Sequence, residues 1–233
     1  MPSTRQGDIH DYEFGPDDGA ELSGWRPALI ISNNGFNEGF GTAIALPISS
    51  SMPAERYRTR QHVYVAGVDS WASTRQVRAV RQRRLGAIMG RASLDELDDI
   101  IEALARRFAT TNRPGEVATA DGIMPIDAGA LWRLPVIGPG GGAFFTTVLV
   151  IDYHAGNNLA ITVEVEEREP RPGSPGDVPV NVLGSNGSVT ALIRRVRAMV
   201  VGERGLTAAG RIQPERAGAV IRRLISMIQP PEA

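Results

Sequence analysis

The chain of 233 residues contains one pattern twice, 120 positions apart. An apolar stripe at helical spacing occurs in both places: Leu97, Ile100, Ile101, Leu104 and Phe108, then Ala217, Val220, Ile221, Leu224 and Ile228. Upstream, the apolar run at 28–31 matches the run at 148–151, and Arg91 matches Arg211. Because strand and helix recur in the same order, the repeat predicts two copies of one folding unit.

The repeat sets the expected domain boundaries. We predict a first domain at 1–110, a linker at 111–121 and a second domain at 122–233, each domain near the commonest domain size. The linker is predicted because its residues are polar, include Pro114 and Gly115, and show no periodicity.

Each copy is expected to be mainly β. In the first copy, strands are predicted at about 9–14, 28–31, 42–48, 62–65, 76–80 and 85–89. Ser93 and Glu96 form a capping box that predicts a helix reaching Phe108, and Pro214 suits the first position of the final helix. The predicted fold class is therefore α+β: two small antiparallel barrels in tandem, each followed by a C-terminal helix.

Composition narrows the class of protein. No apolar run approaches the roughly 20 residues of a membrane span, and the first residues lack a secretory signal, so we expect a cytoplasmic protein without membrane contact. There is no cysteine, and His10, His62 and His154 show no ligand spacing. The prediction is therefore no metal and no cofactor.

The basic residues are unevenly distributed. All 25 are arginine, and nine of them lie between Arg56 and Arg91, where Asp69 is the one acidic residue. Such a stretch can attract a phosphate backbone. The alternative is that these arginines lie on solvated strand faces and are balanced by acidic residues elsewhere.

Four segments of the first copy, in this order, resemble one family. They are Gly7-Asp8-Ile9, then residues 26–32 (RPALIIS), then Pro47-Ile48-Ser49-Ser50, then Gln76-Val77-Arg78 ahead of Arg84-Leu85-Gly86. This order resembles the MazF/PemK toxins, the endoribonucleases of bacterial toxin–antitoxin pairs, over about residues 6–108. The resemblance implies an SH3-like barrel with a C-terminal helix.

The resemblance also implies site residues. The family's catalytic arginine corresponds to Arg26, and the position of its catalytic threonine holds Ser49; Ser50 is the alternative if the register differs by one. Gln76 and Arg78 fall where the family often has polar residues that line an RNA groove. For Arg26, the structural alternative is an ion pair with the acidic loop at 17–21.

Base recognition would require aromatic faces near this site, because single-stranded RNA is bound through splayed bases. Trp25 and Tyr57 are predicted to bind RNA in this way. Trp71 is a further candidate, with burial in the barrel core as the alternative.

The predicted activity is endoribonuclease cleavage of single-stranded RNA without metal. The substrate's 2′-OH attacks the adjacent phosphorus, leaving a 2′,3′-cyclic phosphate and a 5′-OH, while arginine stabilises the charge on the phosphoryl oxygens. The alternatives are a catalytically lapsed module that binds RNA or protein, and a toxin of the same fold that inhibits DNA gyrase.

The second copy lacks the implied catalytic pair, because Thr146 and about Glu166 fall at the positions of Arg26 and Ser49. It is therefore expected to be inactive. Since the resembled family forms symmetric dimers, the chain is predicted to form a pseudo-dimer by itself. An antitoxin is the expected protein partner, and a higher oligomer with that antitoxin is left open.

Overall fold

The computed structural model describes ten stretches of the chain: 4–15, 22–51, 60–110, 115–119, 122–137, 143–154, 159–174, 176–183, 188–201 and 206–229. The chain divides into two compact units. One consists of Met1–Ala109 together with Ile225–Ala233, and the other of Thr110–Leu224. The assignment of an active first domain and a degenerate second domain stays a prediction.

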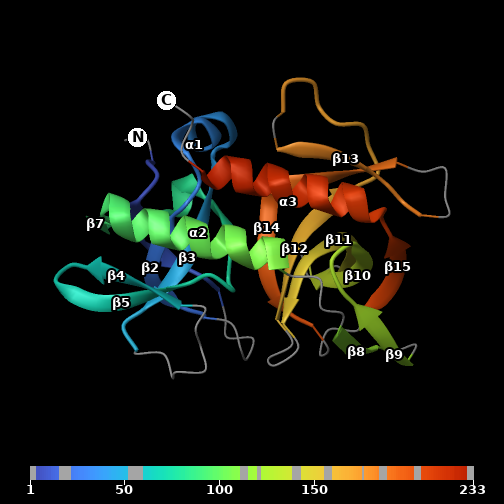
Figure 1. Cartoon of the computed structure of the whole chain (residues 1–233), viewed down its shortest axis with the longest axis horizontal. Helices are drawn as coiled ribbons and strands as arrows, with labels where there is room; N and C mark the ends of the chain where they lie inside the picture. The colour runs from blue at the N-terminus through green and yellow to red at the C-terminus, as the bar shows by residue number, and fades with distance from the viewer. Residues whose placement is uncertain are drawn as a thin grey trace. The chain divides into compact units, whose positions relative to one another are not determined.

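The first unit is a curled antiparallel sheet followed by a helix. Its elements are β1 (Asp8–Glu13), β2 (Trp25–Ile30), α1 (Asn34–Phe40), β3 (Thr42–Ser49), β4 (Arg60–Val65), β5 (Val68–Ser73), β6 (Arg78–Arg81), a 3₁₀ turn (Gln82–Arg84), β7 (Ile88–Arg91) and α2 (Leu94–Thr110). The strands are ordered β4-β5-β3-β2-β1-β7, and β6 pairs with β3 beside β5. Helix α2 lies across β2 and β3 (Figure 1), with its apolar stripe buried.

The second unit repeats this arrangement. Its elements are β8 (Gly115–Thr119), β9 (Gly122–Ile126), β10 (Ala130–Ile137), β11 (Ala143–His154), β12 (Leu159–Glu166), β13 (Asp177–Asn181), β14 (Ser188–Val200), β15 (Thr207–Arg211) and α3 (Pro214–Ile228). The main sheet is ordered β13-β14-β12-β11-β10-β15, and β8 and β9 form a separate hairpin. Strand β14 takes the place of both β5 and β6.

The two sheets share the same β-bulge between corresponding strands. β1 pairs with β7 through Asp8–Arg91 and Ile9–Gly90, then shifts register so that His10 meets Ile88. β10 pairs with β15 with the same shift, from Leu131–Gly210 to Trp132–Ala208. Because a β-bulge is a specific feature of a strand pair, its recurrence supports duplication of a whole unit.

A glycine precedes the first strand of each sheet. Gly7 and Gly129 have φ of +86° and +97°, a region that disfavours side chains. Each donates its N–H to the neighbouring strand, at Ile30 O and Val150 O, over 2.8 and 2.9 Å. A Cβ at Gly7 would lie 3.7 Å from Leu97 of α2, an ordinary van der Waals distance, so the positive φ rather than lack of space favours glycine here.

The predicted fold class is confirmed: mainly β, with two antiparallel sheets that are each followed by a helix. The capping box is also confirmed, since Ser93 N and Oγ donate to Glu96 Oε2 and Glu96 N donates to Ser93 Oγ. Several elements were not predicted, among them the following three. Helix α1 follows Asn33, where only a turn was expected; β5 was not predicted; and residues 115–119 of the expected linker form β8.

The last turn of α3 belongs to the first unit. Asn33 N donates to Met227 O over 2.8 Å, and Gln6 Nε2 donates to Ile228 O over 2.5 Å. The Asn33 side chain also accepts from Phe36 N at the start of α1. One asparagine therefore caps both the beginning of α1 and the end of α3.

Among the described residues, no helix combines the length and apolar character that crossing a membrane requires.

We expect Gly7→Ala and Gly129→Ala each to lower the free energy of unfolding by roughly 1–2 kcal/mol, because an alanine Cβ disfavours positive φ. Gly39→Ala is the control, since Gly39 lies in α1 with no atom within 4 Å of an added Cβ. Urea unfolding measures all three. Equal stability of Gly7→Ala and Gly39→Ala would contradict the role of the turn.

Candidate functional site

A row of side chains crosses the sheet of the first unit. Tyr12 pairs with Arg26, Ser49 with Trp71, and Trp71 with His62. Ala28 pairs with Pro47, the last pair of the β2–β3 ladder, and Arg26 and Ser49 each lie two residues beyond that pair, on the same face of their strands. Paired residues of antiparallel strands share a face. The five therefore lie on one face, in the order β1, β2, β3, β5, β4.

The row runs from the core to the surface. Tyr12 is 7% exposed and belongs to the apolar cluster with Ala28 and Ile30, whereas the His62 side chain is 52% exposed. Arg26, Ser49 and Trp71 are half-buried. The two predicted catalytic residues thus both lie at the edge of the core, where a polar substrate can approach.

The residues just before β2 orient the Arg26 side chain. Its Nε donates to Ser23 O over 2.7 Å, which fixes the plane of the guanidinium group relative to β2. A planar guanidinium with a fixed plane suits bidentate binding of a phosphate. The acidic residues proposed as the structural alternative lie at 17, 18 and 21, outside the described residues.

Gln76 and Arg78 hold the base of the β1–β2 loop. Gln76 is 5% exposed, and its Oε1 accepts from Leu22 N over 2.7 Å. Arg78 Nη1 donates to Phe14 O over 2.9 Å, with its guanidinium 5.6 Å from the centre of the Phe14 ring. The two side chains therefore bind the two ends of this loop, next to Ser23. Both were predicted to line an RNA groove, a role that stays a prediction; their contacts point to positioning of the loop.

The remaining predicted residues surround Ser49. Ser49 Oγ accepts from Ser51 N over 3.2 Å, and Ser50 is exposed. Trp25, next to Arg26, is 66% exposed, which is unusual for a tryptophan. Tyr57 lies outside the described residues.

His62 is a polar member of the row whose role the sequence did not indicate. Its Nε2 donates to Asp69 Oδ1 over 2.8 Å, its Nδ1 lies 4.0 Å from Glu96 Oε1, and its ring meets the Trp71 ring edge-on at 6.2 Å. Burial alone would raise the pKa of Glu96, but hydrogen bonds from Ser93 and Tyr64 outweigh it and lower that pKa. Cross-strand pairing places these residues together, and no sequence spacing signals it.

His10 is a contrasting case. It is 7% exposed on β1, with Nδ1 3.2 Å from Gly86 O, and its buried Nε2 has no hydrogen-bond partner among the described residues. Trp132 holds the same register position in the second unit, and its Nε1 is likewise buried without a described partner. A shared buried position indicates that His10 is a core residue.

The same row in the second unit has different chemistry. Leu134 pairs with Thr146, Glu166 with Thr190, and Thr190 with Pro179. The β11–β12 register, continued by one residue from Thr147–Val165, sets Thr146 opposite Glu166. Thr146, Glu166, Thr190 and Pro179 thus stand at the positions of Arg26, Ser49, Trp71 and His62. Phe145, however, is 66% exposed at the position of Trp25.

Glu166 belongs to an ion-pair network. Arg168 Nε binds it over 2.5 Å and Arg195 Nη1 over 2.8 Å. Arg168 also reaches Asp177 over 2.8 Å, and Arg194 pairs with the same carboxylate. The hydrogen bond from Arg168 is the main cause that lowers the pKa of Glu166. These arginines are therefore already paired with carboxylates of the same unit.

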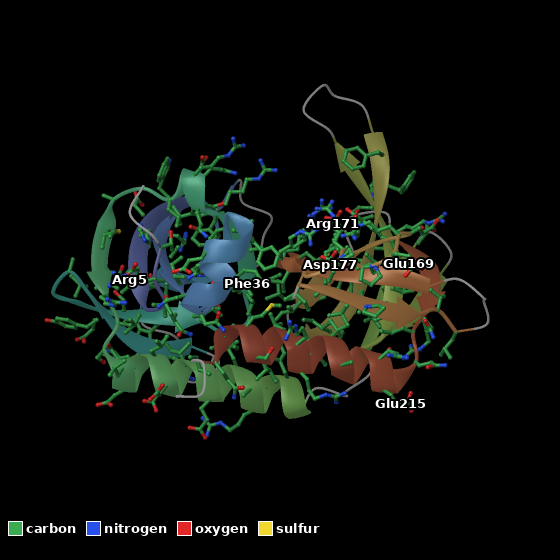
Figure 2. The ribbon with its side chains drawn as sticks, turned by 90° about the horizontal axis from the view of Figure 1, so that it is seen from above. Arg5, Phe36, Glu169, Arg171, Asp177 and Glu215 are labelled. Carbon is green, nitrogen blue, oxygen red and sulfur yellow. The ribbon has the colours of Figure 1, made fainter. Side chains whose placement is uncertain are left out.

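Asp177 is the buried centre of this network. Its side chain is fully covered, and Figure 2 shows it beside Arg171, whose backbone N–H donates to it over 3.2 Å. Burial alone would raise the pKa of Asp177. The hydrogen bonds from Arg168, Arg171 and Arg194 outweigh that effect and lower the pKa to about 2.

Within the described stretches, no three histidines, aspartates or glutamates come together as a metal site would require.

Comparison with known proteins points to one family. The model of the PemK-like, MazF-like toxins of type II toxin–antitoxin systems matches residues 5–108. Endoribonuclease MazF9 of Mycobacterium tuberculosis strain H37Rv is 30% identical over 108 residues, which cover 43% of this chain and 92% of that protein.

Two solved structures are also similar. MazF from Deinococcus radiodurans is 22% identical, with a TM-score of 0.41, over 47% of this chain and all of that one. A mycobacterial endoribonuclease solved with its cognate antitoxin is 19% identical, with a TM-score of 0.37, over 46% of this chain and 93% of that one.

The low pKa of Asp177 predicts acid sensitivity. A carboxylate whose folded pKa is about 2, below its ordinary 3.8, contributes stability above pH 4 that is lost as the pH falls toward 2. Asp177→Asn should remove this pH dependence and cost about 3–5 kcal/mol at neutral pH, because it breaks a buried pair. Denaturant unfolding between pH 2 and 7 measures both effects. Asp99→Asn, exposed on α2, is the control, and an equal response of the two variants would contradict the assignment.

Proposed function

Because the chain belongs to the PemK-like, MazF-like family of type II toxin–antitoxin toxins, we propose that its first unit is an endoribonuclease that cleaves single-stranded RNA. The observation that supports the proposal is that Arg26 and Ser49 lie on one face of neighbouring strands, both half-buried. An Endoribonuclease MazF9 aligned over 92% of its length supports the same activity.

In the proposed reaction, the 2′-oxygen of the substrate attacks the adjacent phosphorus as the bond from phosphorus to the 5′-oxygen breaks. The 2′-hydroxyl loses a proton and the leaving 5′-oxygen gains one, so a 2′,3′-cyclic phosphate and a 5′-OH result. Arg26 stabilises the extra negative charge on the phosphoryl oxygens, which is the largest contribution that such a site makes. Ser49 donates its hydroxyl hydrogen to the same phosphate.

Around this pair, we assign the other residues by their contacts. Exposed Trp25 and Ser50 are placed to touch RNA, and aromatic faces suit unpaired bases. Gln76 and Arg78 position the β1–β2 loop, whose Ser23 carbonyl orients Arg26.

The second unit is proposed to be inactive and to serve as the structural partner of the first in a pseudo-dimer. At the phosphate position it offers Thr146 in place of a cation, and Glu166 would repel a phosphate. Family membership makes an antitoxin protein the proposed regulator.

The direct test is cleavage of a long single-stranded RNA by the purified chain without added metal. Arg26→Ala should slow cleavage by about 10²–10³-fold, the effect of removing one preorganised donor. Thr146→Ala, at the matching position of the second unit, should leave the rate unchanged. Undiminished cleavage by Arg26→Ala, with the fold intact by circular dichroism, would refute the proposal.

The positioning role of Gln76 has a separate test. Gln76→Leu keeps most of the side-chain volume but leaves the Leu22 N–H without its acceptor, at a cost of about 1–3 kcal/mol. Amide hydrogen exchange at 22–24 should quicken and kcat should fall several-fold, while RNA affinity is retained. If Gln76 instead contacts RNA, affinity falls and exchange at 22–24 does not change.

A further inference from the structure

We propose that a projecting arm of the second unit binds single-stranded RNA outside the cleavage site, through the rings of Phe144 and Phe145 and the guanidinium group of Arg133. The inference takes only its ligand, single-stranded RNA, from the proposed function. It gives the unit that is proposed to be inactive a part in holding the substrate.

The arm consists of the ends of β10 and β11 that lie beyond the neighbouring strands. Among the described residues, the β10–β15 ladder reaches Arg133, and the β11–β12 ladder begins at Thr147. Residues 135–137 and 143–145 lie beyond both ladders and stay paired with each other. Figure 2 shows this hairpin extending beyond the rest of its sheet. No other strand of the sheet therefore flanks the arm.

Two neighbouring aromatic rings on the arm are exposed. Phe144 is 51% and Phe145 66% exposed, and because successive residues of a strand face opposite sides, the two rings lie on opposite faces of the arm. The corresponding ribbon of the first unit is covered instead: Phe14 is 6% exposed, with the Arg78 guanidinium over its ring. Two adjacent phenylalanines that the fold leaves uncovered point to a surface that a ligand covers.

The charge beside the rings favours an anionic ligand. Arg133 is exposed, and since Thr147 pairs with it and Pro135 pairs with Phe145, Arg133 is the diagonal neighbour of Phe145, about 7–8 Å away between backbones. Its side chain has no ion-pair or hydrogen-bond partner among the described residues. Strands β10 and β15 and residues 143–151 of β11 contain no aspartate or glutamate. The cation is therefore available to a phosphate.

Single-stranded RNA fits this combination of groups. Its unpaired bases stack on aromatic faces, and its phosphates bind arginine in bidentate fashion. The first unit shows that the fold does not require the cation, because its β1 carries Asp11 and Glu13 where β10 carries Arg133 and Pro135. The second unit has thus kept an exposed ring at this place and exchanged two carboxylates for an arginine, a change that suits a polyanion.

The test measures binding of the full chain to a 2′-O-methyl RNA dodecamer of mixed sequence by fluorescence anisotropy, at several salt concentrations. Phe145→Leu should weaken binding about tenfold, because leucine is apolar but has no π-face, whereas Phe145→Tyr should bind like the parent chain. Arg133→Gln should also weaken binding. It should lower the slope of log affinity against log salt by about 0.7, the share of one phosphate contact to a single strand.

Two exposed residues of the same unit serve as controls. Leu183, 48% exposed, and Arg216, exposed on α3, lie away from the arm, so Leu183→Ala and Arg216→Gln should bind like the parent chain. The proposal is overturned by an absence of binding in the parent chain, by unchanged affinity in Phe145→Leu or Arg133→Gln, or by equal losses in the two arginine variants, since net charge alone would then explain the effect.

Failure of this proposal and failure of the proposed function give different results. The oligonucleotide has no free 2′-OH and cannot be cleaved, so its binding does not depend on catalysis at Arg26. Undiminished cleavage by Arg26→Ala would defeat the nuclease assignment, whereas normal RNA binding by Phe145→Leu would defeat the arm alone.

Discussion

Arg26, Ser49, Trp71 and His62 lie on one face because β2, β3, β5 and β4 pair in antiparallel register. A slip of one residue would send alternate side chains to the opposite face. The pairing is fixed by buried residues such as Leu29 and Leu46, so the core, rather than the polar residues themselves, decides which groups face a substrate. The Gly7 turn fixes where β1 begins against β2, and the hydrogen bonds of Gln76 and Arg78 fix where the intervening loop leaves and returns.

In the second unit, the residues that maintain the fold are kept, whereas the polar residues that would face a substrate are changed. The second unit keeps the strand order, the bulge, the glycine turn and the helix after the sheet, all of which stabilise the fold. At the row, it exchanges a cation and a hydroxyl for a threonine and a glutamate that is held by Arg168 and Arg195. A network with internally balanced charges is stable by itself but leaves little attraction for an anion. What persists at the surface is an aromatic ring, with Phe145 as exposed as Trp25.

Predictions from local sequence patterns were confirmed for the helices whose ends are set by residues close by in the chain. The Ser93–Glu96 box and the apolar stripe place α2 correctly, and Pro214 begins α3. Helix α1 escaped prediction because its seven residues include two glycines and its stability comes from the Asn33 cap. The choice of Arg26 and Ser49 as site residues came only from the family resemblance. The loop contacts of Gln76 and the His62–Asp69 pair depend on cross-strand register, for which a single sequence carries no signal.

The capping of α3 by Asn33 and Gln6 bears on how the protein is made. The unit that contains Arg26 is interrupted in the chain, because the turn from Ile225 completes it only after the whole of the other unit has been translated. At 5–20 residues per second, synthesis of that intervening stretch takes roughly 6–23 s. During this interval the nascent first unit lacks the turn whose carbonyls Asn33 and Gln6 bind.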